Sequence, residues 1–456
     1  MEQLKRVVDF IKDRDEFMVV CHYDADGLAA GAIVSSALDR LGKKNTVVPT
    51  KQMDSERISL IKSGKNHIFA DFGSGQIPVL EENLDDYAII DHHATFGETD
   101  KPHFNAHLVG LDGAKEISGA GMSYLVAREF GFHDLSATAI VGAVGDMQDS
   151  GGKLIGFNRE ILADAEKEGV ITAKTDIRLF GRHSRPLTQF IMFASDPIFP
   201  GLTGNEDAAK SFLADLGIPL RSGGDWLRYA DLDGDQKKKL LSALFVYGKQ
   251  HRVPDRYLKS LVGEVYELTN EPDKSLVKDT KDFATLLNAC GRHEQGAIGL
   301  EVAKGDRGDY YMQAEQLLLQ HRRMLREGIM WAREHGTKDL GAFYLLDAGD
   351  AIKDTLIGVI AGMLYGAQVI KQDKPIIGLS FDEEEGKMKA SGRATWPLVR
   401  SGIHLGKALK AAASAVGGEG GGHNIAAGAH FPPDNREAFL KALATELDAQ
   451  RPRKQF

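Results

Sequence analysis

The stretch FMVVCHYDADGLAAGAIVSSALDRLG (residues 17–42) sets the expected fold. A short apolar run, FMVVC, ends abruptly, and three polar groups follow it on alternate positions: His22, Asp24 and Asp26. Residues 28–42 then have helical periodicity, with Gly42 as a plausible stop. The pattern is that of a buried strand, a polar segment and a helix.

The same alternation continues through the first 150 residues. Strand-like runs at 46–48, 67–70 and 87–90 are followed by helical stretches at 119–131 and 136–146. Alternation of this kind predicts an α/β fold with a parallel sheet covered by helices on both faces. Ligands of such sheets bind at the carboxyl ends of the strands. Acids and histidines occupy these strand ends. HIFA (67–70) is followed by Asp71, and YAII (87–90) is followed by Asp91-His92-His93.

Length and composition bound the class of protein. The chain has 456 residues, 43% of them hydrophobic and 27% charged, which fits a soluble globular protein of two or three domains. Its two cysteines, Cys21 and Cys290, fit a reducing cytoplasm. The N-terminus lacks the apolar core of a signal peptide, and the longest apolar stretch (355–370) is too short to cross a bilayer, so no membrane association is expected. The net charge of −9 argues weakly against a protein that binds nucleic acid through its overall charge, but it does not argue against a local basic groove.

The strand–helix alternation gives way to turn-rich and helical segments after about residue 196 and returns after about residue 325, which predicts three domains. Residues 1–195 form the metal-binding α/β domain, and residues 196–325 a mainly helical middle insertion and connector. Residues 326–456 form a smaller α/β domain that ends in GGEGGGHNIAAGAHF (417–431).

The acids and histidines at the strand ends, together with an acid at the end of a helix, make one candidate ligand set. Its members are His22, Asp24, Asp26, Asp71, His92, His93 and Asp146. Mixed carboxylate and imidazole ligands suit Mn²⁺ and, less well, Mg²⁺, while the absence of thiolates argues against structural zinc. Two ions sharing a carboxylate would hydrolyse a phosphoester or phosphoanhydride. Each motif alone is better explained by a solvated loop or a helix cap, but their combination favours a site. Asp149 is expected to be a turn residue.

These motifs resemble the DHH phosphoesterase superfamily, named for the triplet that stands here as Asp91-His92-His93. HYDADG, ADFGSG and GDMQD match its other N-terminal motifs, and SGRA (391–394) with GGGHNIAAGA (420–429) match its DHHA1 domain. The resemblance spans nearly the whole chain and implies an active-site cleft between the outer domains. It also implies that Asp71 bridges two metal ions, one held by His22 and Asp24 and the other by Asp26, His92 and Asp146. His93 would face the scissile phosphate, and Asp91 would orient a histidine.

The C-terminal motifs point to the substrate. Residues 387–410 carry six lysines and arginines and no acid, beside consecutive glycines. A groove for a nucleic-acid backbone fits this pattern, although a tight turn and a solvated helix face explain the same residues separately. The expected substrate-binding residues are Ser391, Arg393, Gly421, Gly422 and His423.

The large middle insertion, LNACGRH (287–293) and GGEGGGHNIAAGA are similar to the archaeal RecJ-like nucleases, a subgroup that can associate with the GINS replication complex. This similarity implies an exonuclease that cuts single-stranded DNA or RNA to nucleoside monophosphates in replication or repair. Two alternatives stay open. One is a phosphodiesterase or phosphatase of short oligonucleotides or cyclic dinucleotides, and the other is a replisome scaffold with vestigial catalysis.

Overall fold

The computed structural model describes residues 2–51, 53, 55–194, 196–366 and 370–451. The chain forms two units, Met1–Leu318 and Leu319–Phe456. Among the described residues, none of the helices combines the length and the apolar character that crossing a bilayer requires.

The first unit is built on a five-stranded parallel sheet with the strand order β2-β1-β3-β4-β5. Its strands are β1 (Glu16–His22), β2 (Lys44–Thr50), β3 (His67–Ala70), β4 (Tyr87–Asp91) and β5 (His103–Asn105). The second strand lies on one side of β1 and all later strands on the other, so the order reverses between β1 and β3. In open parallel sheets, ligands bind at the carboxyl ends of the strands beside such a point.

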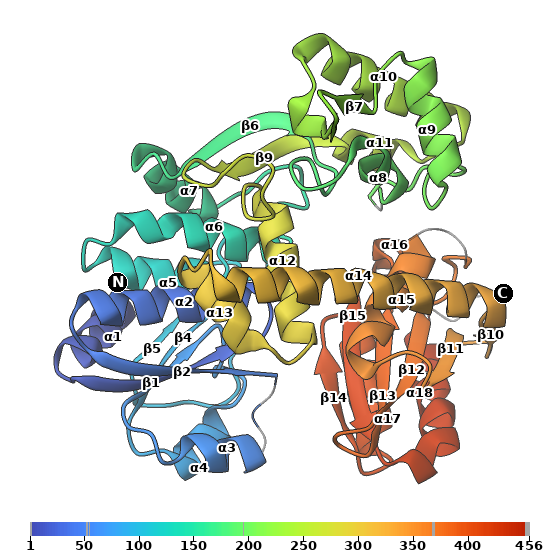
Figure 1. The fold of residues 1–456 in the computed structure, drawn as a ribbon. Coiled ribbons are helices and arrows are strands. Elements are labelled where there is room, and N and C mark those ends of the chain that lie inside the picture. The colour runs from blue at the N-terminus through green and yellow to red at the C-terminus, as the bar shows by residue number, and fades with distance from the viewer. Residues whose placement is uncertain (1, 52, 54, 195, 367–369, 452–456) are drawn as a thin grey trace. The chain divides into compact units, whose positions relative to one another are not determined.

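Alternate residues of the central strands pack into two apolar cores, one on each face of the sheet. Val19 and Ile68 join the core formed with α2 (Ala25–Arg40), α5 (Gly119–Arg128) and α6 (Ser136–Gly145). Val20 and Phe69 join the core formed with α3 (Ser55–Ile61) and α4 (Ile77–Asn83). The two helical layers are visible above and below the blue sheet in Figure 1. Because each face of the sheet is covered by an apolar core, residues that point to either face are apolar, and the strands are continuous apolar runs in the sequence.

Apart from α14 (Asp309–His335) and a helical insert, the remaining helices of this unit lie outside the strand–helix alternation. They are α1 (Glu2–Lys12), α7 (Phe157–Lys167), α12 (Thr280–Arg292), α13 (Gly296–Lys304) and the 3₁₀ turns η1 (His107–Val109) and η2 (His133–Leu135). The long helix α14 begins in the first unit and ends in the second.

A helical insert lies in the chain between β6 (Ile171–Ile177) and β9 (Val262–Leu268), two strands that pair as an antiparallel ribbon (Figure 1). The insert contains α8 (Leu187–Met192), α9 (Glu206–Asp215), β7 (Arg221–Ser222), β8 (Asp225–Trp226), η3 (Tyr229–Asp231), α10 (Gly234–Gln250) and α11 (Asp255–Ser260). It has an apolar core of its own, which includes Phe190, Leu213 and Leu244. Because both ends of the insert enter through one ribbon, contacts at that ribbon fix where the insert is rooted.

The second unit is a six-stranded mixed sheet with the order β10-β11-β12-β13-β15-β14. Only its neighbours β11 and β12 run parallel; the other pairs are antiparallel. The helices α17 and α18 cover one face, and α15 covers the other. Its elements are β10 (Lys338–Asp339), β11 (Tyr344–Gly349), α15 (Asp354–Gly366), β12 (Ile376–Asp382), β13 (Lys387–Arg393), α16 (Trp396–Arg400), α17 (Leu405–Ser414), β14 (Glu419–Gly422), β15 (Ala426–Phe431), η4 (Pro433–Asn435) and α18 (Arg436–Gln450). The expected fold class is confirmed, with a parallel-sheet unit, a mainly helical insert and a smaller α/β unit.

Candidate metal centre

Three strand ends place the N-terminal motif residues in one row. Cys21 of β1 pairs with Ala70 of β3, and Ala70 pairs with Ile90 of β4. The next residue of each strand therefore stands at the same level, and these residues are His22, Asp71 and Asp91. The backbone N–H of Asp71 donates to the Ile90 carbonyl at 2.8 Å, which extends the sheet to this row. The expectation that the polar residues gather at the carboxyl edge of the sheet thus has a direct geometric basis.

The seven candidate ligands form three overlapping groups. In each group, one ligand atom from each residue lies within 4.8 Å of the others: His22–Asp24–Asp71, Asp71–His92–His93 and Asp26–His92–Asp146. Asp71 belongs to two groups and so does His92. The structure therefore brings all seven residues into one continuous cluster, with Asp71 near its centre.

The Asp71 carboxylate provides a test of whether the cluster suits a cation. Asp71 is 1% exposed, and its Oδ1 atom is buried with no hydrogen-bond partner, although His92 Nε2 lies 3.1 Å away. Its backbone has φ +59°, in the left-handed region that non-glycine residues rarely adopt. Strained backbone and an unsatisfied buried oxygen are both costly, and a bound cation would compensate for the second of them. The residues present fit a divalent cation with oxygen and imidazole ligands.

Helix ends position three of the acids. Asp24 is the N-cap of α2, where its Oδ1 accepts from Gly27 N–H at 3.0 Å. The two oxygens of Asp26 accept from the first amides of α5, those of Gly119 and Ala120, at 2.7 and 3.0 Å. Asp146, by contrast, caps the C-terminus of α6. A carboxylate is disfavoured at that negative end of a helix unless a cation lies nearby, which again fits a metal ligand.

Backbone carbonyls and Asp91 fix the two histidines of the DHH triplet. His92 Nδ1 lies 2.6 Å from the Gly113 carbonyl, so Nδ1 donates there and Nε2 is left facing Asp71 and Asp26. Asp91 accepts from the backbone amides of His92, His93 and Ser74 and lies 2.8 Å from His93 Nδ1. Asp91 therefore organises the triplet, while the side chain of His93 is 47% exposed.

Burial and mutual charges shift the pKa values across the cluster. Burial, reinforced by the charge of Asp26, raises the pKa of Asp71 to about 8. For His93, burial opposes protonation, but the hydrogen bond and charge of Asp91 outweigh it and raise its pKa to about 9. The same balance of burial against neighbouring carboxylates raises the pKa of His92. Protonation is thus favoured at Asp71, His92 and His93, whereas, despite burial, the neighbouring histidines lower the pKa values of Asp24 and Asp91.

Gln148, which lies in the motif GDMQD, and Gly113 support the cluster through contacts that the sequence does not indicate. Gln148 Nε2 donates to Asp146 Oδ2 at 2.9 Å and to the Gly113 carbonyl at 2.8 Å, the same carbonyl that binds His92. A Cβ on Gly113 would lie 2.0 Å from the His92 carbonyl oxygen, so only glycine fits there. These contacts join segments far apart in the chain, and only the tertiary structure reveals them.

The expected substrate-binding residues all lie in the second unit. Ser391 and Arg393 are on β13, Gly421 and Gly422 are on β14, and His423 follows β14. Ser391 pairs with Gly428 of β15, which pairs with Gly421, so these three residues form one row across the sheet. Ser391 is buried and Arg393 half-buried, whereas Gly422 and His423 are exposed.

The consecutive glycines form a strand rather than a loop. Cβ atoms on Gly420 and Gly422 would lie 2.9 Å from the Leu409 carbonyl and 2.8 Å from the Ala427 Cα, whereas a Cβ on Gly421 would meet nothing within 4 Å. Close packing of α17 and β15 thus accounts for two of the glycines. Gly421 alone faces open space.

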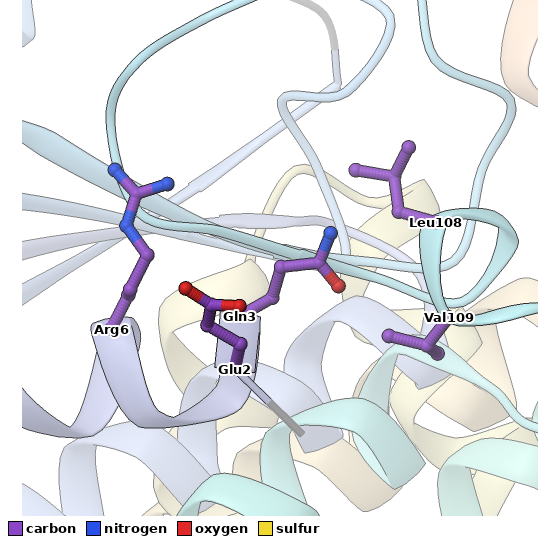
Figure 2. Close-up of a pocket in the computed structure, with 5 residues that line it drawn as sticks. All are labelled: Glu2, Gln3, Arg6, Leu108 and Val109. Atoms are coloured by element: carbon purple, nitrogen blue, oxygen red, sulfur yellow. The ribbon is translucent and has the colours of Figure 1, made fainter.

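Two other features lie apart from the cluster. A surface hollow of about 420 Å³ lies between α1 and η1, lined by Glu2, Gln3, Arg6, Leu108 and Val109 (Figure 2). In the second unit, Asp382, Glu385 and His430 place ligand atoms within 4.8 Å of one another. There the Lys389 ammonium lies 3.0 Å from His430 Nε2, which disfavours a cation.

Comparison with known proteins identifies the family. A model of the DHH-CID domain matches residues 179–262, and a model of the DHHA1 domain matches residues 344–449. The uncharacterized protein MJ0831 of Methanocaldococcus jannaschii is 31% identical over 460 residues, which cover 97% of each chain. The chain belongs to the DHH/DHHA1 superfamily.

Solved structures place this DHH/DHHA1 protein among RecJ-like folds. CDC45 from Entamoeba histolytica is 15% identical and aligns over 98% of each chain with a TM-score of 0.66. An exonuclease RecJ bound to manganese is 16% identical and aligns over 99% of this chain and 95% of its own with a TM-score of 0.58. RecJ from Thermus thermophilus in complex with Mn²⁺ is also 16% identical, with a TM-score of 0.58, over 98% of this chain and 54% of its own. These likenesses establish a shared fold.

Proposed function

We propose that this chain is a metal-dependent exonuclease that hydrolyses single-stranded DNA or RNA to nucleoside monophosphates. The observation that carries the proposal is the position of Asp71, a buried carboxylate shared by two groups of candidate ligands. Two ions about 3.5–4 Å apart stabilise the attacking and leaving oxygens in phosphodiester hydrolysis, and a carboxylate shared by two ligand sets would hold ions that close together. The RecJ structures that contain Mn²⁺ support Mn²⁺ as the ion of this site.

Each ion has its own set of ligands in this proposal. His22, Asp24 and Asp71 would hold one ion, and Asp26, His92 and Asp146 would hold the other. Asp71 would also reach the second ion, because its Oδ1 lies 3.1 Å from His92 Nε2. When bound, such ions activate the attacking water and neutralise the charge that develops on the phosphate oxygens. Gln148 and the Gly113 carbonyl keep Asp146 and His92 oriented toward the second ion.

His93 acts on the substrate rather than on an ion. Its side chain is the most exposed of the three histidines in the cluster, and Asp91 keeps it protonated at neutral pH. A protonated imidazole donates a charge-assisted hydrogen bond to a phosphate oxygen. His93 therefore stabilises the scissile phosphate, and Asp91 sets both its orientation and its charge.

The second unit supplies contacts to the strand. Arg393 suits the phosphate backbone, because a guanidinium binds phosphate oxygens through paired hydrogen bonds. Ser391 and His423 add donors, and Gly421 lets backbone amides approach a phosphate closely, since no neighbour crowds its open side. Gly422, next to Gly421, completes the five proposed substrate-binding residues.

A second candidate function is a replication scaffold. The fold likeness to CDC45 favours it, and a scaffold of this kind would use the insert or another surface to bind a partner such as a GINS-type complex. Retention of all seven ligands in one cluster favours catalysis, because a scaffold would be free to lose them.

Digestion of end-labelled single strands separates these functions. Strands from dinucleotides to several tens of nucleotides are incubated with the wild-type chain and Mn²⁺, with Asp71→Asn as the matched control. Mononucleotides released from every length support the exonuclease, and Asp71→Asn should lower the rate by several orders of magnitude. Cleavage confined to di- to pentanucleotides would favour a short-oligonucleotide phosphodiesterase. No cleavage with both ions bound would favour the scaffold.

A further inference from the structure

The segment 146–154 connects the metal cluster to the root of the helical insert. It begins at Asp146, which is the C-cap of α6 and a candidate ligand. At its far end, Gly152 O accepts from Glu264 N–H at 2.8 Å, and Leu154 N–H donates to the Tyr266 hydroxyl at 2.9 Å. Both of these partners lie on β9, the strand by which the chain leaves the insert (Figure 1).

An ion pair holds the near end of the same segment. Arg178 Nη2 lies 2.6 Å from both the carbonyl oxygen and the Oδ2 atom of Asp149, and both side chains are 5% exposed. Lys281 Nζ is 3.6 Å from the same carboxylate. Removing one partner of a buried pair leaves the other charge uncompensated, which is strongly destabilising. Asp149 is therefore more than the turn residue that its sequence context indicates.

Arg178 stands where the two ends of the insert meet. It follows β6 directly, and its backbone N–H donates to the carbonyl of Leu261, just before β9. A Cβ on Gly263 would lie 2.7 Å from Arg178 Cδ and 2.4 Å from Gly152 O, so the ribbon, the arginine and the segment are in close contact. The position of Arg178 is thus fixed by the root of the insert.

Between Asp149 and Asp146 the connection runs through Gln148. This side chain is 5% exposed, donates to Asp146 Oδ2 at 2.9 Å and accepts from Asn158 Nδ2 at 2.5 Å. Met147, next to it, has φ +59°, so the backbone turns sharply between Asp146 and Gln148. A shift of Asp149 would move Gln148 and, with it, the carboxylate of Asp146.

We propose that Arg178 is a positioning residue for the metal ligand Asp146, acting through its ion pair with Asp149. This inference rests on the proposed two-ion site. It assigns Arg178 an effect on one ion only, because Asp146 belongs to the ligand group with Asp26 and His92 and not to the group of His22, Asp24 and Asp71. The root of the insert therefore sets the affinity of the ion held by Asp26, His92 and Asp146.

Calorimetric titration of the full chain with Mn²⁺ tests this assignment. Wild type should bind two ions, and Arg178→Met should weaken one of them by about 10- to 100-fold while the other keeps its wild-type affinity. Arg178→Lys keeps the charge and should recover most of the loss. Arg159→Met is the matched control, because Arg159 also pairs with a carboxylate at β9, that of Glu264, but at the surface. It should leave both affinities unchanged.

The remaining outcomes are equally decisive. The assignment is wrong if Arg178→Met binds both ions with wild-type affinity, or if it lowers the two affinities equally. It is also wrong if the wild type binds fewer than two ions. A general loss of structure would weaken both ions, so the split between them is specific to positioning. If Arg178→Met does not fold, Asp149→Asn replaces it, because it removes the charge and keeps the shape. A wild type that binds both ions but cuts no strand would reject the exonuclease and leave the role of Arg178 standing.

Discussion

Gly119 lies directly against Asp71: a Cβ on Gly119 would come within 2.2 Å of Asp71 Oδ1. Gly119 is also the first residue of α5, and its amide donates to Asp26 Oδ2 at 2.7 Å. One glycine thus touches the carboxylate shared by the two ligand groups and binds a second carboxylate of the cluster. The absence of a side chain there allows the two acids to approach each other.

Gly119→Ala should weaken Mn²⁺ binding without unfolding the chain. The added methyl group must displace Asp71, because atoms separated by 2.2 Å overlap severely, whereas the amide that binds Asp26 is kept. We expect an affinity loss of at least about tenfold in a calorimetric titration, with an unchanged circular dichroism spectrum. Gly75→Ala is the control, since a Cβ at Gly75 would meet nothing within 4 Å. Wild-type affinity in Gly119→Ala would show that Asp71 is not held where the structure has it.

Mn²⁺ affinity should rise with pH until Asp71 is ionised. Burial and the charge of Asp26 raise the pKa of Asp71 to about 8, so below that pH the carboxyl holds a proton that an incoming ion must displace. The affinity is therefore lost as the pH falls, and a proton on the ligand His92, whose pKa is also raised, adds to this loss. Titrations in two buffers of different ionisation enthalpy would count the protons released. An affinity that does not change between about pH 6 and about pH 8 would contradict this coupling.

Asp91→Asn should shift the pH dependence of catalysis. Burial opposes a charge on His93, but Asp91 raises its pKa to about 9, so the protonated form that acts on the phosphate is lost only as the pH rises through that value. Without the Asp91 charge, the pKa of His93 falls and the alkaline decline of kcat should move to lower pH. The pH–rate profile on a labelled single strand measures this. His93→Ala, as the control, should lower the rate and abolish that decline.

The insert should detach locally when Arg182 is removed. Arg182 Nε and Nη2 lie 2.8 and 2.5 Å from Asp279 Oδ2, and Nη2 is 2.9 Å from Glu267 on β9; the side chain is 2% exposed. Arg182→Met removes the ion pair of the buried Asp279 carboxylate, whereas Glu267 keeps Lys174, and it should lower the opening free energy of β6 and β9 by about 3–5 kcal/mol. Hydrogen exchange of the strand amides reports this energy. Arg323→Met, which removes an exposed pair with Glu327, should leave the exchange unchanged. Unaltered exchange in Arg182→Met would refute the anchoring role.

Local sequence signals were sufficient for the fold class and for the gathering of the seven candidate ligands. The apolar run before His22 and the helical periodicity after Asp26 predict a strand end and a helix, and a parallel sheet brings such strand ends together. The superfamily resemblance is confirmed by the DHH-CID and DHHA1 matches, and the RecJ and CDC45 structures share the fold. The domain boundaries and the roles of individual site residues stay predictions.

Contacts between distant segments could not be read from the sequence. The glycines at 420–422 suggest a phosphate-binding loop, but they form a strand because α17 and β15 pack closely against it. Asp149 reads as a turn residue, and its partner Arg178 lies 29 positions away. Gly119 carries no signal at all, since the side chain that excludes a Cβ there belongs to Asp71, which follows β3. Each of these needs the tertiary fold.

The most direct test of the two-metal centre is an anomalous difference map from crystals of the chain soaked in Mn²⁺. We predict two peaks about 3.5–4 Å apart, both in contact with Asp71. One should be bound by His22 and Asp24, and the other by Asp26, His92 and Asp146. A single peak, or two peaks that do not share Asp71, would contradict the two-metal centre on which the proposed function rests.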